Sequence, residues 1–414
     1  MSIMLSDKPR EKINFAWPVT SENSLVLNYL FSETRKIEGA LKSKRIIIFG
    51  AGIRGCCLLV ILQKQGFDNF IFCDNNPEKQ GNLINHYDIV SLETSLNYKD
   101  RQVFLVSPED SSGIGMQLDE AGLVKNQDWF SFSFSAYGRY VEEYVRPVQD
   151  HLLVMGDCAF THIALFDEFT DSLGTMIKNK AGAARCKVLD MHGMGQQAYY
   201  HIARSLLDRG ERPKTFLLLL MIETMAAKVP IMPRTQHPAL INALVDASES
   251  PRKDFYDYAE LAQERFSRFQ TEAFTSFDSN LNQESEKLYM NINYLYKFRE
   301  SSEGVIYLKK TIKMMNDEGI PVVLYVPPVN YFQGERLFGA DFKIRYETNF
   351  GKLYDMLKKD GLFYEIADAS YLLNLEDFAA PNTIDETCND NGRGKLLKFL
   401  GDFQTLTPYL NNYA

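Results

Sequence analysis

The chain has 414 residues, of which 45% are hydrophobic and 24% charged, and its formal net charge is -9. This length exceeds one ordinary hydrophobic core and predicts two domains, and the composition is that of a globular protein. The acidic balance, with no basic stretch to offset it, argues against a nucleic-acid partner.

Neither a membrane segment nor an export signal is expected. The most apolar run, residues 216–222, is far shorter than the roughly 20 residues that a membrane-spanning helix needs, and residues 1–12 contain no apolar region of the secretory type. The six cysteines are scattered and show no C-x-x-C spacing. These features predict a cytoplasmic protein with free thiols and no bound metal.

The first third of the chain alternates between strand-like and helix-like patterns. A helix is expected over residues 21–41, and a second helix should begin at Ile53 and end at Gly66. Strands are expected over residues 45–50, 69–74 and 103–107. Such alternation predicts parallel βαβ units, and therefore an α/β fold. Because Pro147 interrupts the chain between two patterned regions, we expect domains over residues 1–147 and 148–414.

A glycine-rich turn joins the first of these strands to its helix. Gly50-Ala51-Gly52-Ile53-Arg54-Gly55 fits the pattern G-x-G-x-x-G. The first glycine permits the tight turn, the second admits a phosphate, and the third lets the helix pack closely on the strand. The helix N-terminus then offers amide donors, and Asp74 could accept hydrogen bonds from a ribose. The predicted cofactor-binding residues are Gly50, Gly52, Arg54, Gly55 and Asp74. The alternative is a turn that only closes the domain.

Residues 44–95 resemble a known type of domain. Asp74-Asn75-Asn76-Pro77, followed by Gly81 and then Ile89-Val90, is similar to the N-terminal domain of bacterial sugar O-acetyltransferases and of related polysaccharide-biosynthesis proteins. The resemblance implies a Rossmann-like fold. It also implies a nucleotide-sugar, or equally NAD, as the ligand.

The second part of the chain contains another series of strands and helices. A helix is expected over residues 196–208, and residues 225–303 form a polar, aromatic and helical stretch typical of an insertion or lid. The expected strands are residues 152–155, 187–190, 216–222, 322–326 and 363–366. This order predicts a second α/β domain.

Several segments of this domain resemble the SGNH (GDSL-like) hydrolase family. Residues 151–158, ending in Gly-Asp-Cys, are similar to the family's first block, with Cys158 in place of its serine. Residues 188–195 resemble the second block, in which the amide of Gly195 would join the oxyanion hole, and residues 308–328 resemble the helix and strand before the late loop. Residues 385–392 resemble the last block. The resemblance implies an α/β/α three-layer domain with acyltransferase or esterase activity.

The sequence departs from the family pattern at the residues that carry its chemistry. Cys158 replaces the serine, and Cys388 stands where the family has its histidine. The third-block asparagine is not evident, since Glu223 and Thr224 follow that strand. A catalytic triad needs an imidazole that takes and returns a proton, which Cys388 cannot supply in the same geometry.

One interpretation is that Cys158 is a nucleophile activated by another histidine, because a thiol needs less activation than a hydroxyl. His162 lies four residues later and would share a helix face with Cys158. His192 lies beside the second-block glycines, and His237 lies in the insertion. These three histidines are the candidate bases.

Three other interpretations remain open. The domain could be a silent relative that binds a sugar or an acyl carrier. It could transfer a group directly, with Asp157, Asp385 or a histidine as base. A metal site of Cys158, Cys388 and a histidine is least favoured, because structural zinc sites usually contain closer pairs. A disulfide between the two cysteines is not expected either.

The resemblances together imply modification of a bacterial surface-glycan precursor, in which an acyl group is transferred to or removed from a sugar hydroxyl. The first domain would hold the nucleotide-sugar, and acetyl-CoA is a candidate donor. Cys158 would be the nucleophile or occupy its place, Gly195 and the Cys158 amide would bind the oxyanion, and Asp385 would orient a base. This scheme requires the loop of Asp385 to lie beside Cys158. The alternatives are a silent two-domain binding or scaffold protein and a nicotinamide-dependent oxidoreductase.

Overall fold

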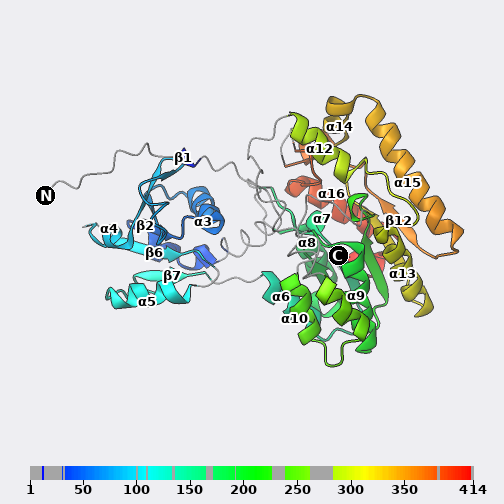
Figure 1. Ribbon diagram of the computed structural model, residues 1–414, viewed down its shortest axis with the longest axis horizontal. Helices are drawn as coiled ribbons and strands as arrows, with labels where there is room; N and C mark the ends of the chain where they lie inside the picture. Colours follow the sequence, from blue (N-terminus) through cyan, green and yellow to red (C-terminus); the bar gives the residue numbers. More distant parts are fainter. Residues whose placement is uncertain are drawn as a thin grey trace. The chain divides into compact units, whose positions relative to one another are not determined.

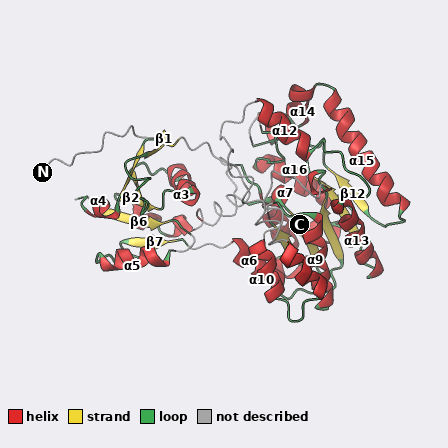
Figure 2. Cartoon of the chain, viewed as in Figure 1, coloured by secondary structure: helices red, strands yellow, loops and turns green. Residues whose placement is uncertain are grey.

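The computed structural model describes residues 12–13, 30, 33–98, 101–108, 111–132, 136–164, 171–191, 193–225, 238–261, 283–379 and 383–411. The chain forms two compact units. The first consists of residues Met1–Pro18 and Leu25–Ala136, and the second of Val19–Ser24 and Tyr137–Ala414. Each unit contains a mainly or wholly parallel sheet with helices packed on it (Figures 1 and 2). The predicted α/β class is therefore confirmed.

The sheet of the first unit contains seven strands among the described residues, in the order β1-β4-β5-β3-β2-β6-β7. They are β1 Lys12–Ile13, β2 Arg45–Phe49, β3 Phe70–Cys73, β4 Leu83–Ile84, β5 Tyr87–Val90, β6 Gln102–Val106 and β7 Trp129–Ser131. Adjacent strands are parallel except β4 and β5, which are antiparallel. The three strands predicted from the sequence are β2, β3 and β6, each within one residue of its expected limits.

Helices cover both faces of this sheet. They include α2 Glu38–Leu41, α3 Ile53–Lys64, α4 Leu92–Leu96 and α5 Ser112–Glu120. Ile47 and Phe49 of β2 pack with side chains from α4 and α5, whereas the intervening Ile48 faces α3. Helix α3 ends just before Gly66, whose φ of 88° suits glycine. Of the helix expected over residues 21–41, most residues before 33 lie outside the described part.

The sheet of the second unit contains five described strands, all parallel, in the order β12-β11-β10-β8-β9. They are β8 Leu152–Gly156, β9 Cys186–Asp190, β10 Thr215–Leu219, β11 Val322–Val326 and β12 Glu365–Asp368. Strand β12 begins two residues later than predicted. The reason is that the backbone of Phe363 bonds to the side chain of Asn316 instead of to the sheet, which leaves the Phe363 side chain 78% exposed.

Helices also pack on both faces of the second sheet. The helices are α6 Ala136–Val145, α7 Cys158–Thr161, α8 Leu173–Ala181, α9 Gln196–Asp208, α10 Pro238–Asp246, α12 Gln283–Asn293, α13 Glu303–Asp317, α14 Tyr331–Phe338, α15 Asp341–Lys359, α16 Asp390–Gly401 and α17 Thr407–Leu410. Alternate residues of β8, such as Leu152 and Val154, pack with α8, α16 and α17. Helices α9 and α13 pack together, and α13 contacts β11. Helix α9 has the limits predicted from the sequence.

The stretch expected to form an inserted lid contains three helical segments among its described residues. It contains α10, residues 253–261 and α12. Residues 226–237 and 262–282 of this stretch lie outside the described part. The helical character is therefore confirmed for the described portion, and a role as a lid stays a prediction.

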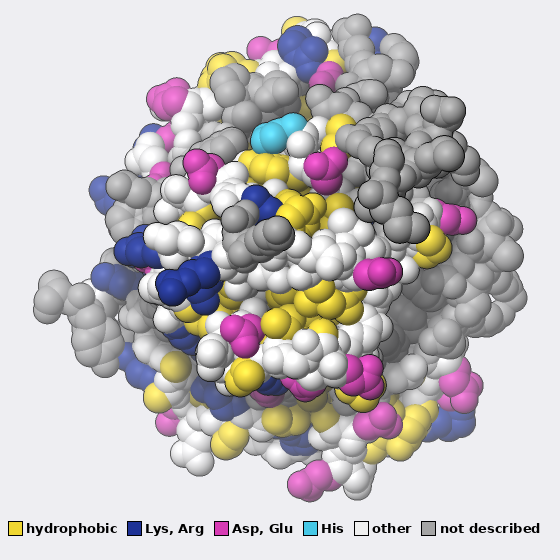
Figure 3. All heavy atoms as spheres, turned by 90° about the vertical axis from the view of Figure 1, so that its left-hand side faces the viewer, with side chains coloured by type: hydrophobic (Ala, Val, Ile, Leu, Met, Phe, Trp, Pro, Cys, Tyr) yellow, Lys and Arg dark blue, Asp and Glu magenta, His cyan; other side chains and the backbone are white. Residues whose placement is uncertain are grey.

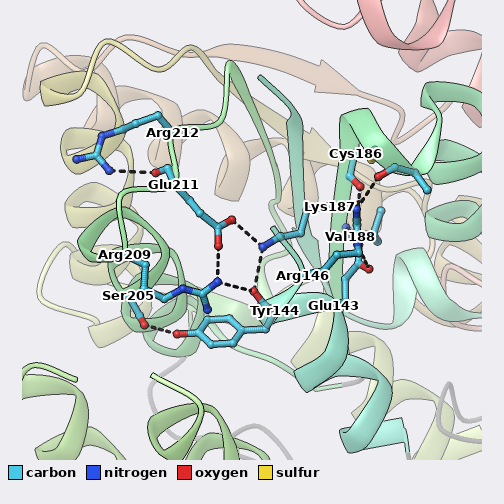
Figure 4. Close-up of polar contacts among 11 residues, drawn as sticks. Glu143, Tyr144, Arg146, Cys186, Lys187, Val188, Ser205, Arg209, Glu211 and Arg212 are labelled. Carbon is cyan, nitrogen blue, oxygen red and sulfur yellow. Dashed lines mark hydrogen bonds and ion pairs between the residues drawn. The ribbon is translucent and has the colours of Figure 1, made fainter. Parts of the chain in front are cut away.

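Helix α6 packs into the second unit (Figure 4). The amide of Val188 in β9 donates a hydrogen bond of 3.1 Å to Glu143, and Lys187 donates one of 2.9 Å to the carbonyl of Tyr144. The buried Tyr144 hydroxyl bonds to Ser248 at 2.6 Å. The units thus separate after Ala136, eleven residues before the expected limit (147 - 136). Pro147 ends a helix there rather than a domain.

None of the described helices is long and apolar enough to cross a membrane. On the face drawn in Figure 3, lysine and arginine side chains lie among acidic and hydrophobic ones. All six cysteines are free and buried.

Candidate functional site

The order of the strands in the second unit creates a position where a ligand can bind. Strand β8 lies between β9 and β10, which are the next two strands in the chain. In open parallel sheets, ligands bind at the carboxyl ends of the strands where the winding direction reverses. Asp157 and Cys158 follow β8 directly, and Glu223 begins the short helix η2, Glu223–Met225, just after β10.

A tight turn places Cys158 at the end of β8. Asp157 is the N-cap of α7, and its Oδ1 accepts a hydrogen bond of 3.2 Å from the amide of Ala159. The thiol of Cys158 donates to the same oxygen at 3.4 Å. A Cβ on Gly156 would lie 2.2 Å from the ring of Phe160, so only glycine allows the helix to fold back onto the strand in this way.

The loop before α16 brings a second acidic side chain to the same place. Phe378 and Cys388 form an antiparallel bridge that holds this loop, and the amide of Thr387 donates to Asp385 at 2.9 Å. Between them, Glu386 is buried, and its Oε2 accepts a hydrogen bond of 3.3 Å from the Tyr294 hydroxyl. The predicted approach of this loop to the end of β8 is confirmed.

His162 lies between the two segments. It is the C-cap of α7 and is buried, and its Nδ1 hydrogen-bonds the Thr387 hydroxyl at 2.7 Å. Glu386 Oε1 lies 3.7 Å from the same nitrogen. Potential ligand atoms of Cys158, His162 and Glu386 all lie within 4.8 Å of one another, as do those of Asp157, Cys158 and Glu223. We call these five residues the Cys158 cluster.

Burial and mutual repulsion control the protonation of the Cys158 cluster. Burial, followed by repulsion from neighbouring acids, raises the pKa of Glu386 to about 8 and the pKa of Glu223 well above its usual range. Burial likewise raises the pKa of Asp157 to about 7. The pKa of the Cys158 thiol is raised by burial and then by these carboxylates, while burial lowers the pKa of His162.

These shifts determine which groups can move protons near neutral pH. A reactive cysteine normally lies in electropositive surroundings that favour the thiolate. Around Cys158 the neighbours are acidic, so its thiol stays protonated. Carboxyl groups with raised pKa values beside a neutral imidazole are instead suited to general acid–base catalysis.

The structure separates the other sequence-predicted residues into three groups. Gly195 is the N-cap of α9, and the next residue, Gln196, bonds to Thr224 at 3.1 Å, so this helix end lies at the same sheet edge as Glu223. The charge of Asp385 favours a higher pKa for the His162 imidazole, against the larger lowering by burial, and Oε1 of Glu386 lies 3.7 Å from Nδ1 of the ring. His192 and His237 lie outside the described residues.

Cys388 lies in the hydrophobic core and not in the Cys158 cluster. It packs among residues such as Phe378 and Leu396, and its thiol donates to the carbonyl of Glu386 at 3.1 Å. Both Cys388 and Cys158 are free thiols, so the disulfide that was not expected is not formed. Position 388 therefore contributes packing, and the imidazole at this site comes from His162.

Sequence reasoning did not select Glu386 or Glu223 as site residues. Glu386 directly follows Asp385 in the last block, and Glu223 stands where the resemblance leads one to expect an asparagine. Both signals were visible in the sequence. The choice between Asp385 and its neighbour depended on the direction in which the loop points each side chain.

The glycine-rich turn of the first unit has the expected backbone geometry. Gly50 has a φ of 110°, and a Cβ there would lie 2.6 Å from the Ser107 hydroxyl. A Cβ on Gly55 would lie 2.0 Å from the carbonyl oxygen of Gly50. Gly52, the N-cap of α3, has open space around it. Each glycine thus has the steric setting that the motif predicts.

The side chains near this turn are engaged within the protein. Asp74 Oδ2 accepts hydrogen bonds from the amide of Ala51 at 2.7 Å and from Lys79 at 3.1 Å. Arg54 donates to the carbonyls of Ser107 and Phe132 at 3.0 and 3.2 Å. Asp74 therefore fastens the turn to β3, and Arg54 ties the start of α3 to the segments that follow β6 and β7.

The sequence was compared with protein-family models and with curated proteins. No family model matches the chain, and no curated protein matches it significantly.

Proposed function

We propose that the second unit transfers an acyl group to a sugar hydroxyl, or removes it, by general acid–base catalysis in the Cys158 cluster. The observation that carries this proposal is the convergence of Cys158, His162 and Glu386 within 4.8 Å at the carboxyl end of β8. Titratable groups with pKa values shifted in opposite directions at such a position are typical of catalytic sites.

The topology supports the SGNH-like interpretation of this unit. The strand order β12-β11-β10-β8-β9, with Asp157 and Cys158 after the first strand and the Glu386 loop before a late helix, agrees with the order of blocks in the family resemblance. Fold alone does not determine activity. The glycan substrate therefore remains part of the proposal, carried by the resemblance of the first unit to domains of sugar-modifying proteins.

In the proposed mechanism, Cys158 occupies the place of the family's nucleophile without forming a thioester. His162, whose imidazole is neutral, takes the proton from the attacking hydroxyl or water, whose oxygen then bonds to the acyl carbon, while Glu386 lies beside the ring. The amides of Cys158 and Gly195 would stabilise the oxyanion. The proton passes to the departing oxygen or, with an acetyl-CoA donor, to the departing sulfur.

The first unit would hold the phosphate-bearing part of a nucleotide-sugar. Open space at Gly52 lets a phosphate approach the N-terminus of α3, and Lys79 adds a positive charge beside the turn. Asp74 already bonds to Ala51 and Lys79. Recognition of a ribose by Asp74, in NAD as in a nucleotide-sugar, would require this carboxylate to leave those partners, so the proposal for this unit rests on the phosphate position at Gly52.

The proposal is tested by the effect of Glu386→Gln on turnover of p-nitrophenyl acetate and acetyl-CoA by the full-length chain. We expect kcat/KM to fall about 100-fold or more, the usual size of a general acid–base contribution. Glu335→Gln, at an exposed position of α14, is the matched control. Intact-mass measurement after rapid quenching should find no acetylated Cys158, and an acetyl thioester there would instead establish covalent catalysis.

A silent binding protein is the second candidate. It is favoured by the burial of Cys388 in the core at the position of the family's histidine. This candidate predicts no turnover above background in the wild type, together with saturable binding of a UDP-sugar. Equal rates for wild type and Glu386→Gln would favour it over the enzymatic proposal.

A further inference from the structure

The Cys158 cluster contains more acidic groups than its surroundings neutralise. Asp157, Glu223 and Glu386 converge around one thiol and one imidazole. Among the described residues, no lysine or arginine forms an ion pair with any of the three carboxyl groups. Buried charges in proteins are normally paired or coordinate a metal.

Two buried oxygens of the Cys158 cluster have no hydrogen-bond partner among the described residues. One is Oδ2 of Asp157, a fully buried residue, and the other is Oε1 of Glu386, whose side chain is 1% exposed. The latter is the oxygen that lies 3.7 Å from Nδ1 of His162. Leaving buried oxygens unpaired is costly, so each one in a native structure calls for an explanation.

We propose that the Cys158 cluster binds a divalent metal ion of the zinc type, with Cys158, His162 and Glu386 as ligands. A thiolate, an imidazole and a carboxylate are a donor set that Zn²⁺ prefers. The ion also supplies the positive charge that the carboxyl groups lack. This inference rests on the site of the proposed function and deepens it by naming a cofactor: with the ion bound, His162 and Glu386 would act as ligands, and the ion would activate the attacking water or hydroxyl in their place.

The geometry admits such an ion with small adjustments. In a tetrahedral site, zinc–ligand bonds of about 2.0–2.3 Å place two ligand atoms about 3.3–3.8 Å apart. The three ligand atoms here lie within 4.8 Å of one another, so side-chain shifts of at most about 1 Å bring them to that spacing. Asp157 or Glu223, which form a second triad with Cys158, can complete a four-coordinate site.

The surroundings of His162 also suit a ligand. Histidines that bind metals usually have a hydrogen-bond partner on the other ring nitrogen, which fixes the ring. The hydroxyl of Thr387 bonds to Nδ1 at 2.7 Å and can hold the imidazole in this way. Binding the ion would convert the Cys158 thiol to a thiolate and release its proton to solvent.

The test is direct metal binding by the purified full-length chain after treatment with a chelator. Titration with Zn²⁺ against a chromogenic competitor should give a single tight site per chain. Substitution with Co²⁺ should give a thiolate-to-metal charge-transfer absorption band. Neither readout requires an active enzyme, so failure of metal binding is distinguishable from failure of the proposed acyl chemistry.

Two cysteine variants form a matched pair for this test. Cys158→Ala should weaken Zn²⁺ binding at least about 100-fold and abolish the Co²⁺ charge-transfer band. Cys388→Ala, a buried cysteine in the neighbouring loop but outside the Cys158 cluster, should preserve both. Glu386→Gln, which nearly conserves size, should also weaken binding, and this guards against the possibility that Cys158→Ala fails to fold.

Three results would overturn the inference. They are the absence of Zn²⁺ binding by the folded wild type, equal binding by Cys158→Ala, and loss of the Co²⁺ band in Cys388→Ala alone. The last would place the thiolate ligand at position 388.

Discussion

The hydroxyl of Thr387 hydrogen-bonds Nδ1 of His162 at 2.7 Å and joins the loop before α16 to the end of α7. Both residues are buried, so the contact fixes the orientation of the imidazole relative to Cys158 and Glu386. Thr387 is therefore a positioning residue for either role of the Cys158 cluster, in proton transfer or in metal binding.

Replacement of Thr387 by valine should weaken both roles while it leaves the fold intact. Valine has nearly the same shape as threonine but lacks the hydroxyl. The His162 ring therefore loses its hydrogen-bond partner and is no longer held in a single orientation. We expect Zn²⁺ affinity to fall about 10-fold or more, as is typical for residues that orient a ligand. Thr387→Ser should restore most of the affinity in the same titration. If valine and serine behaved alike, the hydroxyl would have no positioning role.

The glycines of the first unit are predicted to differ sharply in their tolerance of a methyl group. Gly55→Ala places a Cβ 2.0 Å from the carbonyl oxygen of Gly50 and should lower the free energy of unfolding by roughly 1–3 kcal/mol or more. Gly52→Ala meets open space and should cost less than about 1 kcal/mol. Trp129 is buried in the core of the first unit, so urea unfolding followed by tryptophan fluorescence measures the difference. Equal losses would contradict the packing described for Gly55.

Tyr144→Phe tests the assignment of α6 to the second unit. The hydroxyl bonds to Ser205 and Ser248, and its removal from a buried site should cost about 1–2 kcal/mol. The loss should appear in the far-ultraviolet circular dichroism transition of the second unit and leave the tryptophan transition unchanged. Tyr256→Phe, at a half-exposed position, is the control. A shift of the tryptophan transition alone would assign α6 to the first unit.

His151 should make the stability of the second unit depend on pH. Burial, and then the charges of Lys187 and Arg146, lower the pKa of His151 from 6.5 to about 4 in the folded state. Above about pH 6.5 both states are neutral and the stability is complete. As the pH falls toward 4, only the unfolded state gains the proton, so up to about 3 kcal/mol is lost.

The free energy of unfolding of wild type and of His151→Phe is measured at about five pH values between about pH 7.5 and about pH 4.5. The variant should show a shallower decline than the wild type over this range. An identical decline in both proteins would show that His151 makes no contribution to it.

Much of the architecture could be predicted from local sequence patterns. The apolar strand Arg45–Phe49, the glycines that follow it and the helix that ends before Gly66 all depend on neighbouring residues. The same holds for the strand before Asp157 and for helix α9. Local patterns predicted the limit between the domains less well. Pro147 follows the end of α6 whether or not a domain ends there, so this residue does not by itself mark the limit.

The composition of the Cys158 cluster depended on tertiary structure. The Asp157–Cys158 turn and the Asp385 loop could be selected in the sequence because each follows a recognisable pattern. That Glu386 lies 3.7 Å from His162, and that Cys388 packs in the core, depends on where folding places this loop, which the antiparallel bridge between Cys388 and Phe378 holds. This bridge forms only between segments that the folded chain brings together.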